Sequence, residues 1–150
     1  MRFLLVDRIL TLDPGKSVEA EMTLPASEEL FRDHFPGFAV VPGVLLTEMM
    51  AQAAGKCLNA QRLPRGNAML MEIRTARFRS WAKPDQVIRL HATIVGNLKD
   101  VATASCQASV DGARICSAEL LFAFMPIDRF APDYRDAVLE SYLAGAPPNS

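Results

Sequence analysis

Residues 31–55, FRDHFPGFAVVPGVLLTEMMAQAAG, combine a histidine, a Pro-Gly pair and a long apolar run that contains a single acid. Proline is accommodated in the first turn of a helix, so Pro42-Gly43 predicts a helix start. Residues 44–58 are apolar almost throughout, which is typical of a helix buried on all sides. A carboxylate in such a helix is costly to bury unless water, a partner or a substrate meets it, so Glu48 is a candidate functional residue.

A second candidate, His34, lies in an Asp-His-Phe-Pro-Gly turn just before this helix. The helix N-terminus presents unpaired N–H groups, including that of Gly43, which can stabilise a developing oxyanion. A base, an acid and an oxyanion site are the parts needed to remove a proton next to a carbonyl group. The alternatives are a structural histidine and an acid paired with an arginine. Gln52 lies on the helix stripe of Glu48, where it would serve as a support or a contact.

The remaining segments predict a sheet around that helix. Asp111-Gly112 is a hairpin signal between two apolar runs. An antiparallel sheet wrapped around one long central α-helix, an α+β fold, fits this order of elements. The expected strands lie within residues 3–12, 17–24, 67–79, 86–96, 101–110 and 113–125.

The chain changes character after residue 125. Prolines flank an amphipathic stretch over residues 133–143, which predicts a short helix packed on the body. We therefore expect one domain over residues 1–125 and a C-terminal extension over 126–150, whose default role is packing decoration or a frayed terminus.

Composition excludes several classes of protein. A chain of 150 residues with 50% hydrophobic and 22% charged residues forms a folded domain rather than a disordered chain. A formal net charge of −1 gives no reason to propose nucleic-acid binding. We expect no membrane span, because no apolar run is long enough, and no signal peptide, because Asp7 and Arg8 interrupt the first apolar patch.

The three cysteines, Cys57, Cys106 and Cys116, are odd in number and lack short paired spacings. This pattern argues against a disulfide framework or a zinc site and for a reducing compartment. We expect three small core residues in a cytoplasmic protein, with no bound metal.

Several segments together resemble one family, the FabZ-type 3-hydroxyacyl-acyl-carrier-protein dehydratases. The resemblance covers roughly residues 3–125 and keeps the order of the family's segments and its His-to-Glu spacing, so it is more specific than one loose motif. The matching segments are FLLVDRILTLDPGK at 3–16, HFPG at 34–37, PGVLLTEMMAQAAG at 42–55, RFR at 77–79 and VDGARICSAELLFAF at 110–124.

The resemblance implies a hotdog fold and a hydro-lyase acting on a (3R)-3-hydroxyacyl thioester to give a trans-2-enoyl thioester, in the biosynthesis of fatty acids or related acyl chains. It implies that neutral His34 removes the C2 proton and that Glu48 protonates the departing 3-hydroxyl. Gly43, Val44 and Gln52 are the residues expected to bind the thioester oxygen or the substrate. The resemblance implies no metal or redox cofactor, because the substrate is carried on the phosphopantetheine arm of an acyl carrier protein.

The family pattern also implies a homodimer in which His comes from one subunit and Glu from the other, and a trimer of dimers is common in the family. The basic residues Arg77, Arg79 and Lys83 are candidates for docking the acidic carrier protein. The alternative is a solvated strand face, which is the usual environment of such a run.

Four alternatives stay open in function. One is a hotdog thioesterase, which would need a carboxylate and a water placed for hydrolysis. Asp33 stands where the family usually has glycine and Trp81 where it usually has proline, and both flank the expected site. Such changes point to a paralogue for a specialised polyketide, polyene or lipid pathway. A dehydratase-isomerase ranks lower, because that branch usually carries Asp at the position of Glu48. A non-catalytic hotdog subunit that only binds acyl thioesters would need neither His34 nor Glu48.

Overall fold

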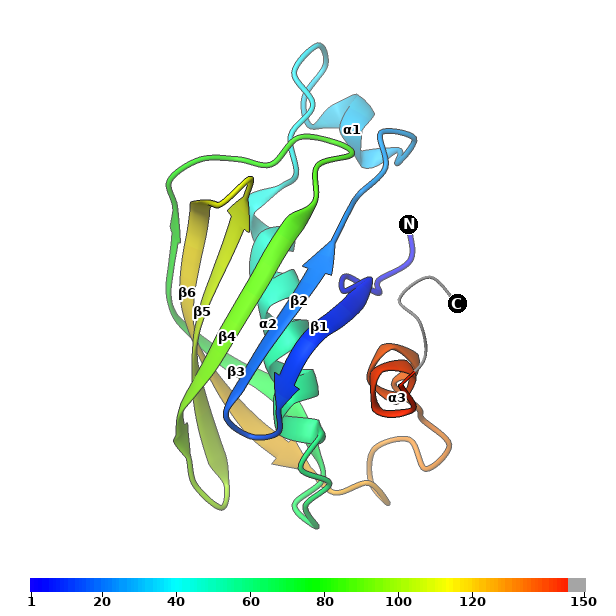
Figure 1. Ribbon diagram of the computed structural model, residues 1–150, viewed down its shortest axis with the longest axis vertical. Helices are drawn as coiled ribbons and strands as arrows, with labels where there is room; N and C mark the ends of the chain where they lie inside the picture. Colours follow the sequence, from blue (N-terminus) through cyan, green and yellow to red (C-terminus); the bar gives the residue numbers. More distant parts are fainter. Residues whose placement is uncertain (146–150) are drawn as a thin grey trace.

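Six antiparallel strands curve around one long helix in the computed structural model, which describes residues 1–145 (Figure 1). The strands are β1 (Arg8–Asp13), β2 (Ser17–Met22), β3 (Asn67–Phe78), β4 (Ile88–Asn97), β5 (Val101–Val110) and β6 (Ala113–Met125). The helices are α1 (Leu30–Asp33), α2 (Gly43–Asn59) and α3 (Ala137–Leu143). The sheet order β1-β2-β4-β5-β6-β3 confirms the predicted α+β hotdog fold. No helix within residues 1–145 is long and apolar enough to cross a membrane.

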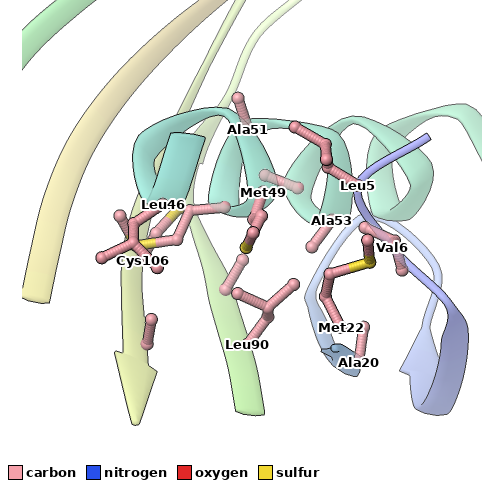
Figure 2. Close-up of a cluster of buried hydrophobic side chains, with 14 of the residues drawn as sticks. Leu5, Val6, Ala20, Met22, Leu46, Met49, Ala51, Ala53, Leu90 and Cys106 are labelled. Carbon is pink, nitrogen blue, oxygen red and sulfur yellow. The ribbon is translucent and has the colours of Figure 1, made fainter. Parts of the chain in front are cut away.

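Alternation along the strands places their apolar side chains under α2. Leu90 and Ala92 of β4 are fully buried, whereas the residues between and beside them are partly or fully exposed. Figure 2 shows Met49 and Ala53 on the side of α2 that faces Leu90 and Met22 of the sheet. The sheet and this side of α2 therefore form one core, and residues pointing the other way from α2 are left for other contacts.

The first predicted strand is shorter than expected. Strand β1 begins at Arg8 rather than at residue 3, because residues 3–5 lie against α2 instead of pairing in the sheet. Leu5 is completely buried there, and its N–H donates to Gln52 Oε1 at 2.9 Å. An apolar run has the same composition in a strand as in a buried extended segment, so its pattern alone does not distinguish the two.

The Asp111-Gly112 hairpin is confirmed. Both residues have positive φ values, 51° and 81°. A two-residue turn of this kind matches the twist of the strands it joins, and Asp-Gly is one of the pairs that tolerate it. It connects β5 to β6, so the strongest local turn signal in the sequence gives the expected pairing.

The C-terminal helix is also shorter than predicted. Helix α3 begins at Ala137 rather than at residue 133, and Asp136 is its N-cap, accepting the Leu139 N–H at 3.1 Å. Figure 1 shows α3 beside β1, at the opposite edge of the sheet from β3. Its buried residue is Leu139. The last part of the predicted extension, residues 146–150, lies outside the described residues.

Strand β3 is an open edge of the sheet. It pairs with β6 on one side, and within residues 1–145 nothing pairs with its other side. Met71 and Ile73 of this strand are 65% and 49% exposed. On α2, Val44 is 75% exposed and Glu48 is only half-buried. A long edge strand with exposed apolar residues invites pairing with another chain.

The three cysteines are buried and unpaired, as expected. Burial raises the pKa of Cys57 to about 11, of Cys106 to about 12 and of Cys116 to about 11. Cys57 Sγ approaches the Asp13 carbonyl oxygen at 3.5 Å, at the turn between β1 and β2. These thiols are therefore structural.

We expect all three thiols to resist alkylation in the folded protein. The thiolate is the reactive form, and raised pKa values keep the thiols protonated at neutral pH. Iodoacetamide labelling followed by mass spectrometry at pH 7.5 should find no modification on the timescale on which all three react in urea. The labelling rate should rise only as the pH approaches 11. Rapid labelling of one cysteine in the native protein would contradict its burial.

Candidate active site

His34 is held in the loop between α1 and α2. Its Nδ1 lies 3.1 Å from the Val40 carbonyl oxygen, and its ring stacks on Phe35 with centroids 4.0 Å apart. A carbonyl oxygen can only accept a hydrogen bond, so in neutral His34 the proton resides on Nδ1 and the lone pair on Nε2. The side chain is only partly buried. The contact with Val40 therefore fixes the orientation of the imidazole, and Nε2 has no hydrogen-bond partner within residues 1–145.

The N-terminus of α2 begins at Gly43, as predicted. The Val41 N–H donates to the Ala82 carbonyl at 2.8 Å, which anchors the chain just before the helix. A Cβ atom at Gly43 would lie 3.1 Å from Cε1 of Phe78, so glycine allows this ring to approach the helix closely. The first N–H groups of a helix, here those of Gly43 and Val44, have no acceptor in the helix itself. They form an anion-stabilising end next to the loop that carries His34.

Glu48 lies just over one turn further along α2 and is half-buried. Its Oε1 accepts a hydrogen bond from Gln52 Nε2 at 3.1 Å. The carboxylate lines a cleft of about 540 Å³ that also contacts Gln52, Lys56 and the N-terminal residue Leu4. This cleft runs from Glu48 toward the C-terminal end of α2. His34 lies in the loop before the N-terminal end of α2 and does not line the cleft. A single chain thus carries a carboxylate in a cleft and an imidazole outside that cleft, in the loop before α2.

Gln52 connects Glu48 to the N-terminal segment. Besides the bond to Glu48, its Nε2 donates to the Phe3 carbonyl at 3.1 Å and its Oε1 accepts the Leu5 N–H at 2.9 Å. Both amide hydrogens are therefore engaged by protein groups. The arrangement favours Gln52 as a residue that positions Glu48, rather than one that contacts the substrate with a free donor.

Replacing Gln52 with leucine should destabilise the protein and disturb Glu48. Loss of its partner leaves the buried Leu5 N–H unsatisfied, which costs roughly 1–3 kcal/mol. Urea denaturation should show this loss. If Gln52 also orients Glu48, kcat should fall more than KM rises. The control is Gln61→Leu, since within residues 1–145 Gln61 makes side-chain bonds only to Arg65 and Asn97, away from Glu48. A stability loss without a change in kcat would leave Gln52 with a structural role alone.

The basic side chains around β3 lie in two environments. Arg65 packs over the Phe124 ring at 3.7 Å and donates to the Leu98 carbonyl, so it is a structural residue. Arg77 and Arg79 are exposed. They lie with Arg114 around a shallow cleft where β3, β5 and β6 meet. Lys83 is also exposed, in the loop before β4.

Some residues of the site region have no local signal in the sequence. Phe78 lies against the start of α2, although it is 35 positions along the chain from Gly43. Tyr134 and Asp136, from the segment after β6, line the cleft that contains Glu48. The only hint of their placement was the predicted packing of an amphipathic C-terminal helix on the body.

The fold and the residues around α2 define a hotdog-fold protein with a candidate acid–base site. Solved structures agree on the fold. The dehydratase heterocomplex ApeI:P from Xenorhabdus doucetiae matches with a TM-score of 0.65 at 17% identity, over 82% of this chain and 84% of that one. A hypothetical thioesterase with coenzyme A from Streptococcus pneumoniae TIGR4 matches with a TM-score of 0.63 at 11% identity, over 79% and 88% of the two chains.

Sequence comparisons identify the family. The model of the FabA-like domain matches residues 1–119. The 3-hydroxyacyl-[acyl-carrier-protein] dehydratase FabZ of Lactiplantibacillus plantarum is 37% identical over 120 residues, 79% of this chain and 82% of the relative. The enzyme of the same name from Listeria monocytogenes serotype 4b is 35% identical over 128 residues, covering 85% and 89%. The chain belongs to the FabA-like family, and the predicted resemblance to FabZ-type dehydratases is confirmed.

Proposed function

We propose that this protein is a hydro-lyase that converts a (3R)-3-hydroxyacyl thioester on acyl carrier protein into the trans-2-enoyl thioester, in fatty-acid or related acyl-chain biosynthesis. The observation that carries the proposal is the arrangement along α2: an imidazole of fixed orientation before the helix, N–H groups without a helical acceptor at its start and a carboxylate in a cleft beyond them. The relatives named FabZ dehydratase support the same reaction.

The mechanism follows from these positions. The thioester oxygen lies at the Gly43 and Val44 N–H groups, which stabilise the negative charge that develops on it. Nε2 of His34 takes the C2 proton, and the electron pair of that bond forms the C2–C3 double bond. The C3–O bond breaks as protonated Glu48 delivers its proton to the hydroxyl, which leaves as water. The proton on His34 returns to Glu48 through solvent before the next turnover.

The substrate is tested directly with both enantiomers of a 3-hydroxyacyl carrier protein. Mass spectrometry of the (3R) form should show loss of one water and partial conversion, because the reaction is reversible. The (3S) form should stay unchanged. Release of free carboxylic acid instead of an enoyl thioester would identify a thioesterase and contradict the proposal.

A homodimer with shared sites is part of the proposal. The open edge of β3, with its exposed Met71 and Ile73, supports pairing with the same strand of a second chain. The cleft beside Glu48 is lined by the chain's own acid, and His34 lies beyond the other end of that cleft. A base from the partner subunit would complete each site. The three buried thiols fit a reducing compartment, and we assign the protein to the cytoplasm.

Arg77, Arg79 and Lys83 are proposed to dock the acidic carrier protein. The double change Arg77→Glu/Arg79→Glu should raise KM for a carrier-bound substrate relative to KM for a pantetheine-bound mimic by about tenfold, roughly 1.4 kcal/mol. The parental KM for the carrier-bound substrate should also rise with salt. Arg89→Glu is the control, because Arg89 lies on β4 and pairs with Glu19 at 3.3 Å. An equal effect on both substrates would contradict carrier docking.

A further inference from the structure

The cleft beside Glu48 extends along α2 toward the C-terminal end of the helix. Its floor is the stripe of α2 that runs from Glu48 through Gln52 and Lys56 to Asn59. If the thioester carbonyl lies at Gly43 and the 3-hydroxyl at Glu48, the bond path from C1 to C3 points along this stripe. The acyl chain beyond C3 would then continue toward Lys56 and Asn59. The eight residues from Glu48 to Lys56 advance ~12 Å along the helix axis.

Two residues of the C-terminal extension, Tyr134 and Asp136, line the cleft at the end that contains Lys56 and Asn59. Lys56 Nζ forms an ion pair with Asp136 Oδ2 at 2.7 Å, and the two side chains are only 7% and 12% exposed. Asp136 also caps α3 through the Leu139 N–H, and Leu139 is buried in the core. Two contacts therefore fix the start of α3 over the end of the stripe. They bring Tyr134 into the cleft wall, where its ring packs edge-on against Phe130 at 5.3 Å.

A second cavity lies behind this wall. It has a volume of about 400 Å³ and shares four lining residues with the Glu48 cleft: Asn59, Asn67, Tyr134 and Asp136. Asn59 donates to Asn67 Oδ1 at 2.8 Å and accepts the Ala68 N–H at 2.8 Å, so both asparagines are tied to the body. Tyr134 is the largest of these four shared side chains, and it is 45% exposed. Burial and the nearby Asp136 carboxylate raise its pKa.

We propose that Tyr134, held in place by the Lys56–Asp136 ion pair, is the stop that limits the length of the acyl chain this protein accepts. The inference rests on the proposed function for the position of C1 and C3. An extended chain advances roughly 1.2 Å per bond, so ~12 Å accommodates about ten carbons beyond C3. The family model ends at residue 119, so this stop belongs to a segment outside the matched domain.

The test is a chain-length profile for the parent, Tyr134→Ala and Tyr134→Trp. Enoyl thioesters of four to eighteen carbons are hydrated, and kcat/KM for each long chain is divided by kcat/KM for the four-carbon substrate. The parental ratio should fall at least about tenfold once the chain passes the stop, as a site that excludes extra methylenes discriminates by 10–200-fold. Tyr134→Ala should restore the ratio by opening the second cavity. Tyr134→Trp should move the fall to shorter chains.

Tyr142→Ala is the matched control. Tyr142 is the other tyrosine of the chain, lies in α3 and lines a different groove, beside Arg8 and Met22. The Tyr142→Ala variant detects a general loosening of the extension, because removal of this ring does not join the two cavities. An unchanged length profile in Tyr134→Ala and Tyr134→Trp, with normal turnover, would overturn the inference. The same broadened profile in Tyr142→Ala as in Tyr134→Ala would also overturn it.

Binding separates failure of the inference from failure of the proposed reaction. Thermal unfolding is followed with saturated acyl-pantetheine thioesters of the same lengths, since a ligand that binds only the folded protein raises Tm. The Tm increase should reach its maximum at a shorter chain in the parent than in Tyr134→Ala. That shift without turnover on any substrate would contradict the proposed reaction and uphold the length stop. Turnover without such a shift would uphold the proposed reaction and contradict the length stop.

Discussion

His34→Ala and Glu48→Gln should each abolish most of the hydration of a crotonyl thioester. General acid–base groups contribute about 10² to 10⁴-fold in rate, so each variant should lose at least two orders of magnitude in kcat. The physical reasons differ. Alanine removes the imidazole whose Nε2 would take the C2 proton. Glutamine keeps the size of Glu48 and its bond to Gln52 but has no proton to deliver at the hydroxyl. Loss of enoyl absorbance measures both.

The controls for these variants come from the other face of the sheet. His91 is the only other histidine in the chain, and it lies on β4 within 3.6 Å of Glu19 on β2. Both residues alternate with fully buried neighbours that face α2, so they point away from the site. His91→Ala and Glu19→Gln should keep activity near the parental level. Parental turnover in His34→Ala would remove the histidine from the mechanism and favour a hotdog subunit that only binds acyl thioesters.

The second large effect is recovery of activity when two inactive chains are combined. Heterodimers of His34→Ala and Glu48→Gln subunits, purified through two different tags, should regain about half of the parental activity. If His34 and Glu48 of one site come from different subunits, one of the two sites in this heterodimer contains both intact residues. The other site contains neither. Each variant alone is inactive, so the signal rises from near zero.

The same design includes a control with the opposite outcome. A heterodimer of the parent with the double variant His34→Ala/Glu48→Gln has one defect in each shared site, so it should be inactive. If each site were built within one chain, the two outcomes would exchange: the first heterodimer would be inactive and the second half active. The pair of measurements therefore decides whether sites are shared, independently of total protein or tag effects.

Much of the local structure could be predicted because it depends on neighbouring residues. Pro42 marks the start of α2, and the Asp111-Gly112 pair sets the β5–β6 hairpin through its positive φ values. Strand positions from β2 to β6 follow from alternation and turn residues. The candidate chemistry also follows from short spacing, since His34 and Glu48 flank a single helix start. Family membership could also be predicted from the sequence alone, because several segments match the family in the same order.

The errors arose where a segment's partner decides its structure. Residues 3–5 look like a strand, but Gln52 of α2 binds the Leu5 N–H and the Phe3 carbonyl in place of a neighbouring strand. Helix α3 starts later than its apolar pattern suggested because Asp136 serves as both N-cap and ion-pair partner. Patterns of hydrophobicity do not report such competition between partners.

The sequence by itself determined which segments form strands, the central helix, the hairpin and the candidate base and acid, because these depend on periodicity and turn chemistry within short stretches. Tertiary structure alone decided which face of α2 stays open, where the cleft from Glu48 leads and which residues line its far end. Lys56 and Asp136 are 80 residues apart, and neither has a local feature that predicts the other. The two charged side chains pair because the packed chain brings them together and buries both.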